Sequence, residues 1–151
     1  MFSAPWPHKI RRYRIADQNS LIGTINAVCA GGMMRTPRFE PTPAWEHALA
    51  RPDCPCHLLL VAADGANIVG WCRLFPTDEG ALELGIGVVA PYRCRGLGRA
   101  LLGAALEWAL ARGMPVVLET RTDNAPAVRL FTRSGFRVVG QQDGHWQMRY
   151  P

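Results

Sequence analysis

Two spacings of apolar residues alternate along the chain, and together they predict a mixed α/β fold. Helical spacing places Leu21, Ile25 and Val28 on one face of a segment that follows a candidate cap at Asp17. Continuous or alternating apolar runs bounded by turn residues predict strands. We expect strands at residues 10–15, 58–63, 68–75, 81–89, 115–120, 136–139 and 146–150.

The remaining segments connect these strands. A short helix is predicted after Thr42, and longer ones from Leu97 to Gly113 and behind Asn124. Residues 33–43, which contain three prolines, are expected to form a loop over a site. This order of elements predicts helices around one central sheet.

Two glycines interrupt the strand predicted at residues 81–89. Gly85 and Gly87 lie two positions apart and share a face of that strand. Glycine inside a strand indicates a bulge or a place where another group closely approaches the backbone.

A turn rich in arginine and glycine joins this strand to the next helix, in the run Arg93-Cys94-Arg95-Gly96-Leu97-Gly98-Arg99. Such turns direct several backbone N–H groups to one place, where the helix macrodipole is positive. A nucleotide P-loop requires Lys-Ser or Lys-Thr after the last glycine, where this chain has Arg99-Ala100. A dinucleotide loop requires a third glycine, where this chain has Leu101. The turn therefore predicts a different phosphate or pyrophosphate ligand.

The turn resembles the acyl-CoA pyrophosphate loop of the GNAT superfamily of N-acetyltransferases, which has the form Arg/Gln-x-x-Gly-x-Gly/Ala. A second motif similar to that family follows downstream, from Asn124 through Phe131 to Gly135-Phe136. The resemblance implies one acetyltransferase domain over residues 1–151. It also implies a mixed, mostly antiparallel central sheet flanked by helices and splayed between its fourth and fifth strands.

The resemblance assigns the acetyl-CoA contacts. Glycine lets the amides of the turn approach the pyrophosphate without a Cβ, and the arginines add positive charge. The pantetheine arm is expected to lie along the strand end like an added strand. The implied cofactor-binding residues are Val88, Val89, Ala90, Arg93, Arg95, Gly96, Leu97, Gly98, Arg99, Ala100 and Asn124.

Acetyl transfer to a primary amine needs a group that accepts the proton of the amine, because the nucleophile must be neutral. Glu83 is the candidate general base, since many GNAT enzymes, including the phosphinothricin acetyltransferase-like group, carry a glutamate on this strand. A half-exposed surface glutamate is the alternative interpretation. Phe131 stands where many GNAT enzymes have a tyrosine that protonates the thiolate, so no general acid is assigned.

The acceptor is less well specified. We expect it to contact residues 33–43, Trp45 and the turn at 141–145. Arg35 and Arg38 are able to hold a carboxylate, although solvated loop arginines are the commoner case. A small-molecule or peptide amine is therefore predicted. The alternative is a catalytically silent protein of this fold that binds acyl-CoA.

Composition limits the remaining classes. The hydrophobic fraction of 48% and charged fraction of 19% are typical of a soluble globular protein, and a homodimer is possible. We expect a cytoplasmic location, because residues 1–8 lack the charged start and apolar core of a secretion signal. The net charge of +5 suits a phosphorylated cofactor. Without a recognisable nucleic-acid-binding or membrane-spanning pattern, neither of those partners is expected.

Cysteine spacing adds one further expectation. Cys54 and Cys56 form the only close pair among five cysteines, and no second pair has zinc-ribbon spacing. His57 directly follows this pair, so a metal site there is the alternative. His8, His47 and His57 form no recognisable metal motif. We therefore expect reduced, mostly buried thiols and no metal.

Overall fold

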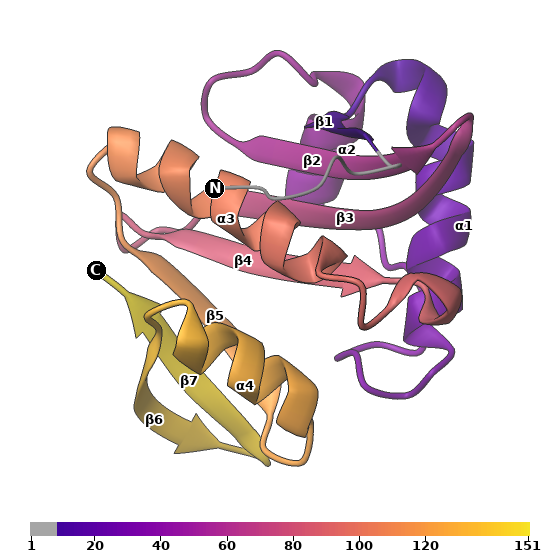
Figure 1. Ribbon diagram of the computed structural model, residues 1–151. Helices are drawn as coiled ribbons and strands as arrows, with labels where there is room; N and C mark the ends of the chain where they lie inside the picture. The colour runs from indigo at the N-terminus through magenta and orange to yellow at the C-terminus, as the bar shows by residue number, and fades with distance from the viewer. Residues whose placement is uncertain (1–8) are drawn as a thin grey trace.

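The computed structural model describes residues 9–151, and a seven-stranded sheet runs through them (Figure 1). The order across the sheet is β1-β2-β3-β4-β5-β7-β6, and every neighbouring pair is antiparallel except β4 and β5. The prediction of a mixed, mostly antiparallel sheet is thus confirmed. The strands are β1 (Lys9–Arg12), β2 (Leu58–Asp64), β3 (Asn67–Pro76), β4 (Leu82–Val88), β5 (Val116–Arg121), β6 (Arg137–Gln142) and β7 (His145–Tyr150).

Helices cover both faces of the sheet (Figure 1). One face packs against α3 (Leu97–Ala111) and α4 (Ala125–Arg133), the other against α1 (Gln18–Cys29) and α2 (Pro43–Ala50). The sequence of β2 explains why both faces are covered, because residues 58–63 of this strand are all apolar and all buried. Leu60 belongs to the core beneath α3, whereas its neighbours Leu59 and Val61 belong to the core beneath α1 and α2. Alternate side chains of one strand thereby enter two cores.

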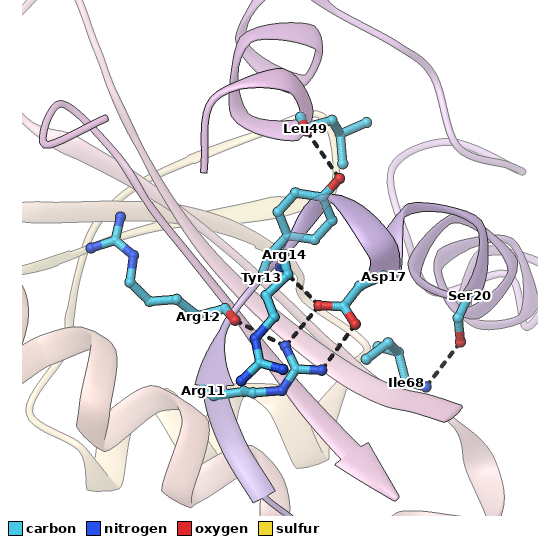
Figure 2. A network of polar contacts seen from close by, with 8 residues as sticks. All are labelled: Arg11, Arg12, Tyr13, Arg14, Asp17, Ser20, Leu49 and Ile68. Atoms are coloured by element: carbon cyan, nitrogen blue, oxygen red, sulfur yellow. Dashed lines mark hydrogen bonds and ion pairs between the residues drawn. The ribbon is translucent and has the colours of Figure 1, made fainter. Parts of the chain in front are cut away.

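The first strand is shorter than predicted, since β1 ends at Arg12. The Tyr13 hydroxyl donates a hydrogen bond to the carbonyl of Leu49 in α2 at 3.0 Å (Figure 2). Asp17 does not cap α1 with its side chain. Its carboxylate instead accepts from the Arg11 guanidinium at 2.7 and 2.9 Å and from the Arg14 N–H at 2.8 Å. The hydrogen bond from Arg11 lowers the pKa of Asp17, so an ion pair fixes the turn into α1.

The two glycines of β4 mark close approach, and the alternative expectation of a bulge was wrong. The pairing of β3 with β4 runs in continuous register, with Trp71 opposite Gly87 and Arg73 opposite Gly85. A Cβ at Gly87 would lie 2.4 Å from the Trp71 ring, and one at Gly85 would lie 2.8 Å from Arg73 Nε. The glycines therefore make room for two large side chains of β3.

The sheet opens between β4 and β5, as the family resemblance implied. The two strands pair in parallel at Leu82–Val116 and Glu83–Val117, and they diverge beyond these pairs (Figure 1). The Leu82 N–H donates to the carbonyl of Pro115 on the β5 side. Because alternate residues direct their backbone groups to the same side, Ile86 and Val88 direct theirs into the opening.

Candidate active site

A cavity of about 470 Å³ occupies the opening between β4, the start of α3 and α4. Most of its lining is apolar. Backbone of residues 93–99, which we call the Arg-Gly turn, forms one end. Its lining residues are Val28, Gly31, Met33, Met34, Ile86, Gly87, Val88, Tyr92, Arg93, Cys94, Gly96, Leu97, Gly98, Arg99, Asn124, Pro126, Ala127, Leu130 and Phe131. We call it the donor cavity.

The Arg-Gly turn presents the N-terminus of α3 to the donor cavity. Gly96 adopts φ +80°, a left-handed conformation that favours glycine, and the preceding Cys94 has φ +61°. No side chain of the described residues caps α3 by a hydrogen bond. The first backbone N–H groups of a helix have no partner within it, so those of Leu97 and Gly98 are available at this positive end.

Seven of the eleven predicted cofactor-binding residues line the donor cavity: Val88, Arg93, Gly96, Leu97, Gly98, Arg99 and Asn124. The other four, Val89, Ala90, Arg95 and Ala100, are not part of its lining. The Val89 N–H donates to Val69 at 3.0 Å, and the Ala100 N–H donates to Gly96. The Arg95 guanidinium lies 5.5 Å from the centre of the Tyr92 ring. The motif overlooked Ile86, whose backbone faces the opening.

Asn124 lies at the start of α4, between the donor cavity and a second cavity. Its Oδ1 accepts a hydrogen bond from the Ala127 N–H at 3.4 Å and so caps α4, as predicted. It lines the donor cavity and also a smaller cavity of about 160 Å³ next to it. Residues shared by both linings join the two: Met33, Met34, Ile86, Asn124, Ala127 and Phe131.

The smaller cavity, which we call the acceptor cavity, is lined by charged side chains from several elements. Arg35 of the predicted loop forms an ion pair with Glu119 of β5. Arg121 from β5 and His145 from β7 lie in the same lining. The loop therefore reaches the site as predicted, through Met33, Met34 and Arg35.

Glu83 lies in the acceptor cavity beside the half-buried Arg73. Its Oε1 is 3.5 Å from Arg73 Nη1, and 46% of its side chain is exposed. Burial lowers the pKa of Arg73, while the nearby Glu83 raises it. The Arg73 guanidinium also lies over the rings of Phe75, at 4.7 Å, and Trp45, at 5.8 Å. Packing of Arg73 thus holds its charge next to the Glu83 carboxylate.

Other residues considered for the site lie outside the two cavities or have other partners. Arg38 and Trp45 do not line either cavity. Trp45 instead packs in the core between Phe39 and Phe75. The Tyr92 hydroxyl donates to the Asp64 carboxylate at 2.6 Å.

Phe131 is 4% exposed and lies at the junction of the two cavities. Its ring packs against Phe136, with the centroids 5.6 Å apart. Phe131 is therefore one of the α4 residues that reach the opening between the strands. A phenyl group offers no proton there.

The prediction of mostly buried thiols was wrong. Cys29 and Cys72 are buried, but Cys54 is half-buried, and Cys56 and Cys94 are exposed; all five cysteines are free. The cause is position, since the exposed cysteines occupy turns outside the two cores.

Comparison with known proteins identifies similar sequences. Residues 30–136 match the acetyltransferase (GNAT) family. The chain is 36% identical over 112 residues to N-alpha-acetyltransferase RimI of Mycobacterium tuberculosis, a match that covers 72% of this chain and 68% of the relative. It is 34% identical over 116 residues to L-methionine sulfoximine/L-methionine sulfone acetyltransferase of Pseudomonas paraeruginosa, covering 68% of this chain and 66% of the relative.

A solved structure shows the same fold. The acetyltransferase of GNAT family from Streptococcus pneumoniae superposes with a TM-score of 0.83 at 23% identity, covering 94% of this chain and 97% of that chain. Among the described residues, no helix has the length and apolar character needed to cross a membrane. Cytoplasmic location and dimerisation stay predictions.

Proposed function

Since the chain belongs to the acetyltransferase (GNAT) family and is an acetyl-CoA-dependent N-acetyltransferase, we propose that it transfers acetyl directly to a primary amine. Both substrates are bound at once in this proposal, one in each cavity. Glu83 is the general base. The single observation that carries the proposal is the opening between β4 and β5, where the two cavities meet and Glu83 lies in the acceptor lining.

The donor cavity suits acetyl-CoA. Its pyrophosphate would lie at the N-terminus of α3, where N–H groups and the helix dipole favour an anion, with Arg93 and Arg99 adding charge. The pantetheine arm would run along the open edge of β4, bonding to the backbone of Ile86 and Val88. The Val88 carbonyl accepts from Arg93 Nε at 2.9 Å, so that arginine also fixes the strand end.

The thioester would lie at the junction of the cavities. The Ile86 N–H faces the opening and would polarise the thioester carbonyl, a role that donors in an oxyanion site perform. The amine nitrogen attacks the carbonyl carbon, the carbon–sulfur bond breaks, and the thiolate departs with the electron pair. Because an ordinary thiol has a pKa of about 8.5, the thiolate leaves without a side-chain acid and takes a proton from water.

Glu83 would accept the proton that the attacking amine loses, directly or through one water. A carboxylate is the protein group that accepts a proton most simply at this position. Arg73 supports the role because its ion pair with Glu83 limits where that side chain turns.

An α-amine is the acceptor that we propose. The similar proteins are named for N-alpha-acetylation and for acetylation of methionine sulfoximine, both of which place the reacting amine next to a carbonyl or carboxyl group. The acceptor cavity, at about 160 Å³, contains Arg35, Arg73 and Arg121, and these are groups able to bind such an oxygen.

Release of free CoA from acetyl-CoA tests the proposal. The panel contains L-methionine sulfoximine, a short peptide with a free N-terminus, the same peptide blocked at its N-terminus, a polyamine and an aminoglycoside. We expect turnover with at least one α-amine and none with the blocked peptide. Binding of acetyl-CoA without turnover of any amine would instead favour the catalytically silent acyl-CoA-binding protein, the alternative that Phe131 supports.

A further inference from the structure

Four side chains of metal-binding type meet at the connection between α2 and β2, outside the donor and acceptor cavities. His47 comes from α2, and Cys54, Cys56 and His57 come from the segment that leads into β2. One potential ligand atom from each residue lies within 4.8 Å of all the others. The arrangement is thus a two-cysteine, two-histidine cluster, to which the fold adds His47.

The geometry of the cluster is close to that of a tetrahedral site. His47 Nε2 lies 3.5 Å from Cys56 Sγ, and His57 Nδ1 lies 3.6 Å from the same sulfur. With zinc–sulfur bonds of about 2.3 Å and zinc–nitrogen bonds of about 2.0–2.1 Å, tetrahedral ligand atoms are separated by about 3.3–3.8 Å. Small side-chain rotations would therefore bring all four atoms onto one ion.

Burial of His57 limits how its ring is placed in the cluster. The residue is 2% exposed, and its Nε2 has no hydrogen-bond partner among the described residues. The ring turns its other nitrogen, Nδ1, toward Cys56 Sγ. Nδ1 is therefore the atom that would bind the ion, with the proton on Nε2. The His57 backbone is already fixed, because Arg12 donates to its carbonyl at 3.2 Å.

We propose that His47, Cys54, Cys56 and His57 bind one Zn²⁺ ion that ties α2 to β2. Two thiolates and two neutral imidazoles form a donor set that zinc favours in closed structural sites, and the thiolates neutralise the charge of the ion. On binding, the two thiols release their protons to solvent, and no group is oxidised or reduced. The sequence-based expectation of no metal rested on the spacing of cysteines and histidines along the chain, which does not show that the fold brings His47 to the cysteine pair.

The backbone of the turn holds the two cysteines close together. The Cys56 N–H donates to Cys54 Sγ at 3.5 Å, and neither cysteine forms a disulfide. Both sulfurs are therefore available as ligands.

The position of the cluster indicates a structural role. The His57 ring packs edge-on against His47 at 5.5 Å and against Phe75 at 6.1 Å. Phe75 belongs to the core beneath α1 and α2. Because bound zinc would link an exposed turn to this core, it would stabilise the folded protein over the unfolded chain.

The test uses the reduced full-length protein after removal of metal by a chelator. Titration with Co²⁺ is expected to give one equivalent with the strong visible absorption of tetrahedral cobalt and a thiolate-to-cobalt band in the near ultraviolet. Zn²⁺ is expected to displace the cobalt and raise Tm. Cys56→Ser should weaken zinc affinity by more than about a hundredfold, since even outer-shell partners of metal ligands contribute 10–100-fold. Cys94→Ser removes an exposed cysteine outside the cluster and should retain one equivalent.

Three results would overturn the proposal. One is an octahedral cobalt spectrum without a thiolate band in wild-type protein whose thiols are shown to be reduced. Another is equal loss of metal in Cys56→Ser and Cys94→Ser. The third is unchanged Tm at saturating Zn²⁺. The cobalt spectrum of the wild-type protein requires no variant, so a folding defect in Cys56→Ser would leave the test intact.

Discussion

The donor and acceptor cavities share one opening in the sheet but are built in different ways. The donor cavity uses backbone at one strand edge and one helix end, which are close together in the sequence, and side chains from residues 28–34 and from α4 complete its lining. The acceptor cavity uses charged side chains from β3, β4, β5, β7 and the loop after α1. Backbone recognition at the donor side suits a cosubstrate common to a family. Side-chain recognition at the acceptor side lets each member select its own amine.

The largest effect is expected from a substitution at Glu83, which should impair the chemical step and leave donor binding intact. Glu83→Gln should lower kcat by roughly 10²- to 10⁴-fold, the usual contribution of a general base, because the amide cannot accept the proton. Acetyl-CoA affinity should change little, since Glu83 is not part of the donor lining. Steady-state CoA release and calorimetric binding measure the two quantities. Glu107→Gln, at an exposed position of α3, is the matched control; equal loss in both variants would contradict the assignment.

A negative charge at the start of α3 should have the opposite effect to Glu83→Gln, because it should weaken acetyl-CoA binding rather than the chemical step. Gly98→Asp places a carboxylate where the pyrophosphate would lie, and the KM for acetyl-CoA should rise about tenfold or more. The same carboxylate favours the helix N-terminus by about 0.3–1 kcal/mol, so Tm should hold or rise. A Cβ at Gly98 meets only Leu130 at 3.7 Å, an ordinary contact. Gly98→Asn controls for size; if its KM rises as far as that of Gly98→Asp, charge is not the cause.

Alanine substitutions at the two glycines of β4 should have different effects, one mainly on stability and the other mainly on catalysis. Gly87→Ala forces its Cβ against the buried Trp71 ring and should destabilise the protein by about 1–3 kcal/mol, as overpacking does. Gly85→Ala meets the movable end of Arg73 and should lower kcat with a smaller loss of Tm. Thermal unfolding and CoA release, measured on both variants, check the contrast. The reverse ranking in Tm would show that Arg73 is held more rigidly than Trp71.

The smallest effect is expected at the junction of the cavities. Phe131→Tyr restores a hydroxyl where many members of the family carry one. Since the thiolate departs unaided in our account, kcat should rise by less than about threefold. Its pH–rate profile should stay close to that of the wild-type enzyme. A large increase in kcat would show that protonation of the thiolate limits the wild-type enzyme.

Local motifs explain why the donor side was predictable from sequence. The strand, turn and helix around Gly96 are adjacent in the chain, so their spacing reflects their geometry. Even there, the prediction included Val89, whose N–H is already paired with β3. The pairing direction of a residue depends on strand register, which a single sequence does not specify.

The acceptor side and the cysteine–histidine cluster were harder to predict because tertiary contacts create them. The sequence indicated that Arg35 was able to hold a carboxylate, but not that it pairs with Glu119. Trp45 was expected at the acceptor, yet it packs in the core. His47 lies on a helix, seven residues before Cys54, and only the fold of the α2–β2 connection brings the two together.

The central claim is that acetyl passes directly between two substrates that are bound at the same time. The order of substrate binding and product release tests this claim most directly. Initial rates of CoA release, measured across a grid of acetyl-CoA and amine concentrations, should give intersecting double-reciprocal lines, because both cavities are filled when transfer occurs. No CoA should be released before the amine is added. Parallel lines, together with one equivalent of CoA released without amine, would show a covalent acetyl-enzyme and contradict direct transfer across the opening between β4 and β5.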